Sequence, residues 1–386
     1  MSRQATQLSY ASPDVEVEAR IAVADRLVTL SERPFTGVVL ASGGGEAVEL
    51  AIAIARRCTG RSWVISFRGC YHGCGSLSGL LGAEFDEPVD ALRQIARKRH
   101  RIMQCALARS SCDVKPTVKT IRERLSHLPE APAAIIVEPI VGVNGFYVLP
   151  REFLQVLRKF ASAMDAVLIF DEVLTGFWRT GKCFAFQGLD CIPDAVCFGK
   201  AVTSGYIPLS GVLLSDKWRI RLAKNPLTWG TTNFAHPIAC AAALCVLAEL
   251  SGPTIQRRLL GLAPVAWDLA YQLAKRMPDI ITEVRGAGLL LALQLSQSLA
   301  GDDRGLRVAT MLRIRSLLYE HGLLAEIDPA IGVIPIAPPF VIDEDHLRLA
   351  FRAIETSLKD IAVENSVRRE NRTRKRYQST SGVMPS

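Results

Sequence analysis

The 386-residue sequence contains no apolar run long enough to cross a lipid bilayer. Its first residues, Met-Ser-Arg-Gln-Ala-Thr, lack the apolar core of a secretory signal peptide. Internal repeats are absent, which excludes a repeat array. Hydrophobic residues make up 49% of the chain, which excludes a disordered protein. We therefore expect a cytoplasmic globular protein with one large domain and a companion, and no membrane partner.

Paired Cys-x-x-Cys motifs are also absent among the ten cysteines. A cytosolic chain seldom holds disulfides, and cysteines in apolar stretches, such as Cys197, behave as small hydrophobes. The segment Cys70-Tyr-His-Gly-Cys74 brings two thiols and an imidazole together. It lacks a second ligand pair, and its spacing matches no common zinc site. The sequence thus predicts reduced cysteines and no metal.

Positive charge is concentrated near the C-terminus. Residues 368–376 hold six Arg and Lys residues against Glu370, a net +5 that leaves only +3 of the total +8 for the rest. We expect residues 361–386 to form a disordered, solvated basic tail. An acidic partner such as nucleic acid is the alternative. Because no aromatic or folded nucleic-acid module accompanies the tail, nucleic acid is not the expected partner.

Apolar runs of strand length alternate with helical patterns through the first two-thirds of the chain. This alternation predicts the α/β class, with a mostly parallel central sheet flanked by helices. A helix is expected over residues 12–31, with Ser12 as N-cap and Pro13 at the first helical position. The other expected helices are 44–57, 89–104, 118–128 and 237–250, and the expected strands are 37–40, 63–67, 133–137, 166–170 and 195–198.

Beyond Pro253 the pattern changes to a helix, short strands at 288–295 and 332–336, and a final helix at 344–361. This predicts a second, smaller α+β domain. The expected organisation is a short N-terminal helical segment (1–35), a large domain (36–250), a small domain (251–360) and the basic tail (361–386).

The segment Ser42-Gly43-Gly44-Gly45-Glu46 predicts a Gly-rich turn between a strand and a helix. Three glycines let the backbone approach an anion closely, and the helix start offers free N–H groups and a positive dipole end. Phosphate is the anion that we expect to bind there. The pattern is neither the dinucleotide fingerprint nor a P-loop, and such a turn is also Gly-rich for steric reasons alone. Both interpretations remain open on this feature.

Two charged residues follow apolar strands: Asp171 comes after 166–170, and Lys200 comes after 195–198 and Gly199. Ligands collect at the carboxyl ends of parallel strands, so both side chains are expected at one edge. Lysine forms a Schiff base with an aldehyde, and an aspartate beside a pyridine nitrogen keeps the ring protonated. Near a phosphate turn, the pair favours an aldehyde cofactor with a basic pyridine ring over two unrelated surface charges.

Longer segments carry a family resemblance. They are SGGGEAVELAIAIAR, YHG, IIVEPIVGVNG, LIFDEVLTGFWRTGKCFAF, PDAVCFGKAVTSGYIPLSGVLL, TTNFAHPIACAAAL and VRGAGLLLAL. The order and spacing of these segments, over residues 15–355, resemble those of the class III, fold type I, pyridoxal-phosphate-dependent aminotransferases. The resemblance implies pyridoxal 5′-phosphate as cofactor and a homodimer with shared active sites.

The resemblance also implies residue roles. Lys200 would hold the cofactor aldehyde and Asp171 would pair with its ring nitrogen, as the catalytic residues. The further cofactor-binding positions would be Gly44 and Gly45 at the phosphate, Tyr71 and Val173 on the ring faces, His72, Glu138 in the site wall, and Thr232 at the phosphate of the neighbouring subunit.

Some positions depart from parts of the family. Leu174 stands where ornithine-type members have Gln, and Val143 stands where they have an acid. With His236-Pro237, these residues resemble the branch that acts on ω-amines and amino-ketones, including the diaminopelargonate-forming enzymes.

Asp328 stands where this branch has an arginine that binds the substrate carboxylate. An acid there would repel a carboxylate and attract an amine or a guanidine. The alternative is a local shift that leaves Asp328 on a solvent loop, and both interpretations remain open.

The expected function is amino transfer between an amine or amino acid donor and a ketone, aldehyde or keto-acid acceptor. A decarboxylase or an aminomutase with the same cofactor would share every residue named above, so these reactions remain alternatives. A non-catalytic relative that binds a partner through its basic tail is the alternative from a different class.

Overall fold

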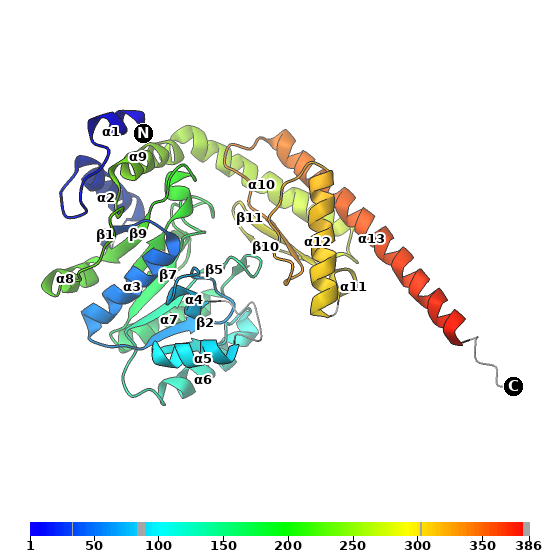
Figure 1. Cartoon of the computed structure of the whole chain (residues 1–386), viewed down its shortest axis with the longest axis horizontal. Helices are drawn as coiled ribbons and strands as arrows, with labels where there is room; N and C mark the ends of the chain where they lie inside the picture. The colour runs from blue at the N-terminus through cyan, green and yellow to red at the C-terminus, as the bar shows by residue number, and fades with distance from the viewer. Residues whose placement is uncertain (33, 83–89, 302, 381–386) are drawn as a thin grey trace. The chain divides into compact units, whose positions relative to one another are not determined.

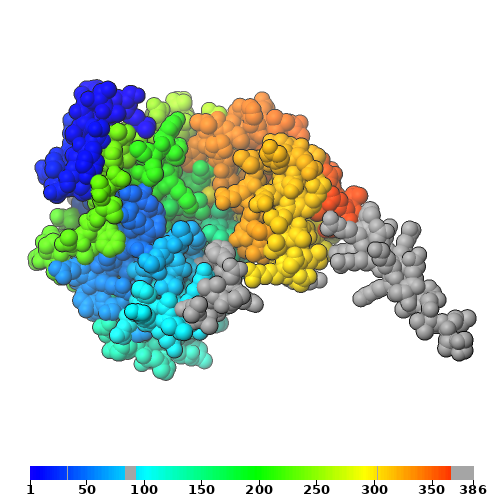
Figure 2. All heavy atoms as spheres, viewed as in Figure 1, coloured from blue at the N-terminus to red at the C-terminus, as the bar shows by residue number. Residues whose placement is uncertain are grey.

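The computed structural model describes residues 1–386 except 33, 83–89, 302 and 381–386 (Figure 1). The chain divides into two compact units, Met1–Arg258 and Leu259–Ser386. The N-terminal residues lie at the surface of the larger unit, where Figure 2 draws them in dark blue.

A seven-stranded sheet forms the centre of the larger unit, in the order β1-β9-β8-β7-β4-β2-β3. The pairs from β3 through β8 are all parallel, and β9 runs antiparallel to both of its neighbours. The expectation of a mostly parallel α/β sheet is therefore confirmed. The strands are β1 (Phe35–Ala41), β2 (Val64–Phe67), β3 (Ile102–Cys105), β4 (Ala134–Val137), β7 (Val167–Asp171), β8 (Ala195–Phe198) and β9 (Ser210–Ser215).

Helices cover both faces of this sheet, which is why its inner strands are apolar without alternation. Alternate strand residues such as Ala134 and Ile136 pack against the apolar side of α3. On the opposite face, Phe67 of β2 meets Phe153 of α7 edge to face, with ring centroids 5.4 Å apart. The described helices of this unit are α1 (Ser2–Gln7), α2 (Glu18–Ser31), α3 (Gly44–Thr59), α4 (Ser78–Leu81), α5 (Asp90–Arg99), α6 (Ser111–Leu125), α7 (Arg151–Ala163), α8 (Asp216–Lys224) and α9 (Pro237–Ser251), with short 3-10 turns η2 (Ala185–Gly188) and η3 (Lys200–Thr203).

The helix expected from Ser12 begins later, at Glu18, so that prediction is wrong at its start. The buried Arg20 explains the difference. Its guanidinium donates to the carbonyls of Ala11, Ser12 and Val15, each at 2.7 Å. These carbonyls are thereby held in a loop around the cation, and the Ser12 carbonyl also accepts a turn bond from Val15 N at 3.0 Å.

The region from 89 to 128 also differs from expectation. The helix expected over 89–104 ends at Arg99, and Ile102–Cys105 instead forms β3, paired in parallel with β2. Residue 89 lies outside the described residues. The helix expected from 118 begins earlier, at Ser111, and includes Pro116. Ser110 stands at its N-cap position, where its Oγ donates to Asp113 Oδ2 at 2.8 Å.

The smaller unit holds a three-stranded antiparallel sheet, β10-β11-β12. Its strands are β10 (Ile281–Ala287), β11 (Leu290–Leu295) and β12 (Val333–Ile336), and its helices include α11 (Gln297–Ala300) and α12 (Arg304–Glu320). Helix α10 (Pro253–Arg276) begins before the division at Arg258.

The last helix, α13, spans Glu344–Thr380 and so continues through most of the segment expected to be disordered. No Gly or Pro interrupts residues 361–380, and Arg, Lys, Glu and Gln are good helix formers.

Among the described residues, no single helix has both the length and the apolar composition needed to span a membrane. The bent pair α9 and α10 meets these two criteria only when taken together.

Candidate active site

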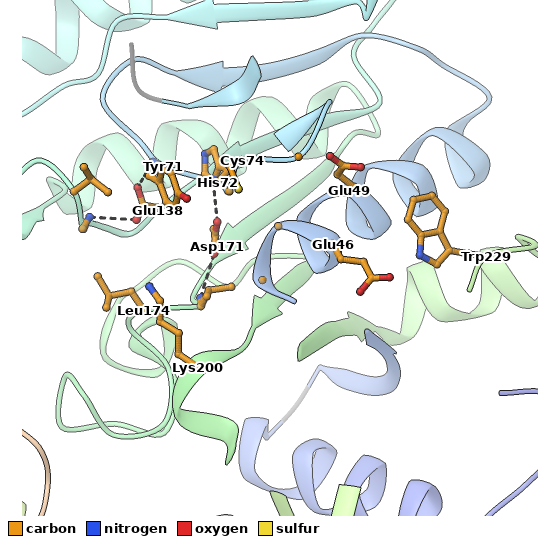
Figure 3. A pocket seen from close by; sticks show the side chains of 17 residues that line it. Glu46, Glu49, Tyr71, His72, Cys74, Glu138, Asp171, Leu174, Lys200 and Trp229 are labelled. Carbon is orange, nitrogen blue, oxygen red and sulfur yellow. Dashed lines mark hydrogen bonds and ion pairs between the residues drawn. The ribbon is translucent and has the colours of Figure 1, made fainter. Parts of the chain in front are cut away.

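A cavity of about 640 Å³ lies in the larger unit, lined by residues that follow the carboxyl ends of β2, β4, β7 and β8 and by the start of α3 (Figure 3). This edge is where ligands bind in open α/β sheets, and the volume suits a small organic cofactor. The lining residues are Gly44, Gly45, Glu46, Glu49, Tyr71, His72, Gly73, Cys74, Gly75, Glu138, Gly142, Val143, Asp171, Val173, Leu174, Lys200 and Trp229.

Most of the residues expected from the sequence are in this wall. They are Gly44, Gly45, Tyr71, His72, Glu138, Asp171, Val173 and Lys200. Thr232 is exposed and does not line the cavity. Asp328 belongs to the smaller unit, where its Oδ1 accepts a hydrogen bond from Ala330 N at 2.8 Å. This bond gives Asp328 a role in its own turn.

Sequence reasoning assigned no role to Glu49, Cys74 or Trp229, which also line the cavity. Glu49 lies one helical turn beyond Glu46, a spacing that places both on one face of α3. Its Oε1 accepts hydrogen bonds from the backbone N–H groups of Leu77 and Ser78 at 3.0 and 3.1 Å, which fixes the loop after Tyr71. Trp229 lies in a segment without local pattern, so only the tertiary structure reveals it.

The Gly-rich turn forms the start of α3, with Gly43 as N-cap. Glu46 Oε2 accepts hydrogen bonds from Ser42 N at 2.8 Å and Gly43 N at 3.4 Å. Within the described part of the chain, the N–H groups of Gly44 and Gly45 have no acceptor. Two free donors at the positive end of a helix form a cradle for an anion such as phosphate.

Close packing explains why Gly44 carries no side chain. A β-carbon there would lie 2.9 Å from Val173 Cγ1, whereas one at Gly45 would meet Gly73 Cα at 3.4 Å and one at Gly43 would meet nothing within 4 Å. We expect Gly44→Ala to destabilise the fold by about 1–3 kcal/mol through overpacking and to weaken anion binding. Denaturant unfolding and inorganic phosphate binding measure the two effects. Gly43→Ala is the matched control, and equal loss in both variants would contradict the steric explanation.

Asp171 lies at the end of β7 and is held by two donors. His72 Nδ1 is 2.8 Å from Asp171 Oδ2, and Val173 N donates to Oδ1 at 3.1 Å. The His72 and Asp171 side chains are only 0% and 6% exposed, so water does not screen their interaction. His72 Nε2 is buried and has no partner among the described residues. The arrangement fixes a carboxylate in the cavity wall with its direction set by the imidazole.

Glu138 joins two parts of the wall. Its Oε2 accepts a hydrogen bond from Tyr71 N at 2.7 Å, and its Oε1 accepts one from Gly142 N at 3.2 Å. Burial raises the pKa of Glu138 to about 7, with a lowering contribution from His72 and a raising one from Asp171. Through its two hydrogen bonds, the Glu138 carboxyl group joins the loop after β2 to the turn after β4.

Glu172 lies next to Asp171 but points away from the cavity into the core. It is fully buried and accepts hydrogen bonds from Phe186 N at 2.9 Å and Thr175 Oγ1 at 3.0 Å, and from Ala185 N. These bonds hold the segment after β7, which includes Leu174. Burial raises the pKa of Glu172 to about 7 from its ordinary value of 4.5, although these hydrogen bonds lower it.

Glu172 gives the stability a defined pH dependence. The folded chain keeps this proton up to about pH 7, whereas the unfolded chain releases it near 4.5. The folded state thus binds more protons in that window, and this group's contribution to the free energy of unfolding falls as the pH rises through it. In Glu172→Gln we expect this part of the slope to vanish, as measured by urea unfolding from pH 5 to 8. Glu249→Gln, at an exposed position, is the control, and a slope unchanged in Glu172→Gln would contradict the assignment.

Lys200 follows β8 and begins the turn η3. Its φ of +43° lies in the left-handed region, which is uncommon for a residue with a side chain. Val202 N donates to Gly199 O at 3.1 Å, which fixes the turn. Such strained residues concentrate at functional sites because the surrounding structure holds them there. The Lys200 side chain lines the same cavity as Asp171 and the Gly-rich turn.

These groups fit an aldehyde cofactor that carries a phosphate and a basic ring. The free N–H groups of the turn match the phosphate, the fixed carboxylate of Asp171 matches a protonated ring nitrogen, and the amine of Lys200 matches the aldehyde. Because Gly44 has no side chain, Val173 packs directly against its backbone, at the place where a β-carbon would lie 2.9 Å from Val173 Cγ1.

Comparison with known proteins places the chain in a family. The family model described as aminotransferase class III matches residues 1–358. Acetylornithine aminotransferase of Methanopyrus kandleri is 30% identical over 356 residues, which cover 92% of this chain and 81% of the relative. The 4-aminobutyrate aminotransferase GabT of Escherichia coli is 31% identical over 320 residues, covering 82% and 73%.

Solved structures agree with this placement. An amine transaminase from an uncultivated Pseudomonas species, solved in a PLP-bound form, superposes with a TM-score of 0.79 at 26% identity, covering 93% of this chain and 85% of the other. The chain therefore belongs to the class III aminotransferase family and is an enzyme that transfers amino groups with pyridoxal 5′-phosphate as cofactor.

Proposed function

We propose that Lys200 and Asp171 are the catalytic residues of this transaminase and that it belongs to the branch acting on ω-amines and amino-ketones. One observation carries the first part: an amine, a buried carboxylate and a free anion cradle line a single cavity. The alternatives of decarboxylation, an aminomutase reaction or a non-catalytic relative find no support among the compared proteins, which are transaminases by name.

In this proposal each side of the cofactor has a protein partner. Gly44 and Gly45 bind the phosphate through backbone N–H groups, and Tyr71 and Val173 pack on the two ring faces. Asp171, oriented by His72, pairs with the ring nitrogen. Glu138 holds Tyr71 in place through the backbone bond described above.

The chemistry then depends on Lys200. When bound, the cofactor supplies an electron sink that stabilises negative charge on the substrate carbon. Lys200 Nζ would accept the proton from that substrate carbon and later donate it, acting in turn as general base and general acid. Asp171 contributes a fixed negative charge that needs no reorganisation during the reaction.

The charges and apolar residues of the cavity wall favour an amine substrate. Val143 and Leu174 give it an apolar section, and Lys200 is the only Lys or Arg among the described residues of the wall. Glu46, Glu49 and Asp171 are carboxylates in the same wall. A substrate carboxylate would find no positive partner here besides the reacting lysine, whereas a neutral or amine-bearing substituent is compatible.

A homodimer with shared active sites is also part of the proposal. Thr232 is exposed, and Ser42 Oγ donates to the carbonyl of its neighbour Asn233 at 3.4 Å, so this loop lies beside the Gly-rich turn. The exposure of Thr232 and its absence from the wall of its own cavity are compatible with a role at the phosphate site of a second subunit.

A panel of donors and acceptors tests the proposed function. Amines with and without a carboxylate on the amine-bearing carbon are offered with pyruvate, 2-oxoglutarate or an aldehyde, and the products are identified. We expect a new amine from the acceptor and a carbonyl from the donor, with ω-amines among the substrates. Release of carbon dioxide, or return of the amino group to the same molecule, would contradict transamination. Exclusive use of α-amino acids would contradict the branch.

Asp328 is proposed as a substrate contact, and the hydrogen bond within its turn allows the proposal to be tested with two variants. Asp328→Asn keeps an oxygen acceptor for Ala330 N, whereas Asp328→Arg reverses the charge. If Asp328 acts on the substrate, both variants shift the preference toward carboxylate-bearing substrates, and the arginine variant shifts it further because it reverses the charge. An unchanged preference in both variants would leave Asp328 with its role in the turn alone.

A further inference from the structure

The buried Arg20 of α2 joins two segments of the larger unit that are far apart in the sequence. Its side chain uses four of the five N–H donors of a guanidinium, and all four acceptors are backbone carbonyls. Three of these carbonyls belong to Ala11, Ser12 and Val15. The fourth belongs to Ala235, which accepts from Arg20 Nε at 2.7 Å. Arg20 therefore fixes the backbone at two places, one on each side of the larger unit's sequence.

Ala235 lies near the end of the 229–236 loop, which leads into α9, and α9 lies beside α2 (Figure 1). Its φ of +50° lies in the left-handed region, which is uncommon for alanine. The next residue, His236, is the N-cap of α9 and accepts a bond from Ile238 N through Nδ1 at 3.3 Å. Such a backbone conformation persists only where its surroundings hold it. The bond from Arg20 thus fixes the loop where it enters the helix.

The same loop reaches the candidate active site. Trp229 lines the cavity (Figure 3), and the Asn233 carbonyl accepts a hydrogen bond from Ser42 Oγ at 3.4 Å. Ser42 stands immediately before Gly43, the N-cap of the helix whose first N–H groups form the anion cradle. From the other side, the Gly43 carbonyl accepts a bond from Ser210 Oγ at 2.7 Å. The Gly-rich turn is therefore held by β9 on one side and by the loop on the other.

The loop has few other anchors among the described residues. Residues 229–233 are exposed, so packing fixes them weakly. Phe234 packs against the core, and its N–H closes a turn within the loop by donating to Thr231 O at 3.0 Å. Without the guanidinium, the buried Ala235 carbonyl would keep only the weak thiol donor of Cys240, at 3.7 Å. Loss of Arg20 would therefore release one end of the segment that contacts the Gly-rich turn.

We propose that Arg20 is a positioning residue for the phosphate site. Through Ala235 it holds the 229–236 loop against the Gly-rich turn, and this raises the affinity of the site for the phosphate group of the cofactor. The inference rests on the proposed function, in which Gly44 and Gly45 bind that phosphate. Arg20 does not line the cavity, so it acts through the loop and not by contact with the cofactor. A guanidinium suits this role, because its planar fork presents several donors in fixed directions.

Two aldehydes separate this role from a general effect on the fold. Pyridoxal 5′-phosphate and pyridoxal differ only in the phosphate group. The whole chain, freed of cofactor, is titrated with each, and the dissociation constants are measured from the visible absorption of the lysine-bound aldehyde. We expect Arg20→Met to raise the constant for pyridoxal 5′-phosphate by about 10-fold, the size of one lost hydrogen bond to a charged group, and that for pyridoxal by less than about 2-fold. A loosened fold would weaken both alike.

Two further variants complete the test. Arg26→Met is the matched control, because Arg26 lies on the same helix but donates to Ser251 Oγ and not to the loop. Its ratio of the two dissociation constants should equal that of the unmodified protein. Arg20→Lys keeps the charge without the planar fork, so it should shift the ratio in the same direction by a smaller amount. It also serves as the test if the methionine variant does not fold. An unchanged ratio in the folded Arg20 variants would overturn the proposal.

The proposed function and the role of Arg20 fail in different ways. If the unmodified protein binds the two aldehydes with equal affinity, the assignment of the phosphate to Gly44 and Gly45 fails. If the unmodified protein prefers the phosphate-bearing aldehyde and the Arg20 variants keep the full preference, the proposed function stands and the role of Arg20 is wrong.

Discussion

Lys200→Ala is expected to reduce amino transfer by about 10⁴-fold, since it removes both the amine that binds the aldehyde and the group that moves the proton. Lys200 is the only lysine in the described cavity wall, so no neighbouring amine can replace it there. The left-handed backbone at Lys200 relaxes little on truncation, because the turn after it is closed by a backbone bond. The fold should therefore survive the substitution.

Single-turnover kinetics and the visible spectrum of the holoenzyme measure this effect. The absorption band of lysine-bound cofactor should be lost, while phosphate-dependent binding of the cofactor at the Gly-rich turn should persist at lower affinity. Methylamine supplied in solution should restore part of the proton-transfer rate, which a purely structural defect would not allow. Lys224→Ala, at the exposed end of α8, is the control. A variant that turns over at the normal rate would refute the assignment of Lys200.

Asp171→Asn is expected to have the second-largest effect, a loss of about 10²- to 10³-fold in rate, the size seen when a preorganised electrostatic partner is removed. The change keeps the shape but removes the charge that holds a proton on the ring nitrogen. It also leaves His72 Nδ1 facing a neutral amide at 2.8 Å in a site where neither side chain is more than 6% exposed. The loss of charge matters more here than at the surface, because buried charges are poorly screened.

Three measurements separate this electrostatic role from a structural one. The cofactor dissociation constant should rise, the pH dependence of the bound cofactor's absorption should shift, and the thermal stability of the cofactor-free protein should change much less than the rate. Asp190→Asn is a suitable control, because Asp190 pairs with Arg151 on the exposed surface. Equal rates in Asp171→Asn and the unmodified enzyme would show that the carboxylate is not part of the chemistry.

Local sequence patterns were sufficient for some elements of the site. Asp171 and Lys200 each follow a short apolar strand, and the parallel class of the sheet implies that such strand ends share an edge. The Gly-rich turn predicted the start of a helix, because Gly44 and Gly45 stand in the sequence just before the apolar residues that α3 buries. These inferences needed only the spacing of apolar residues in the sequence and the direction in which each strand runs.

Other elements depended on contacts between distant residues. The expected helix over 89–104 includes residues 102–104, whereas these residues form part of β3 because they pair with β2. The start of α2 was decided by the carbonyls that Arg20 holds. Neither effect leaves a signal in a short window of sequence, since each partner is supplied by another part of the chain.

The sequence by itself determined the family, the cofactor class and the expected places of Lys200 and Asp171. The tertiary structure decided how the wall is built: His72 lies against Asp171 from 99 residues away, Glu138 joins Tyr71 to Gly142, and Leu174 fills the space beside Gly142. The physical reason is the distance along the chain between the residues that interact. Strand and helix patterns are local, whereas hydrogen bonds and packing between buried groups exist only once the chain has closed around them.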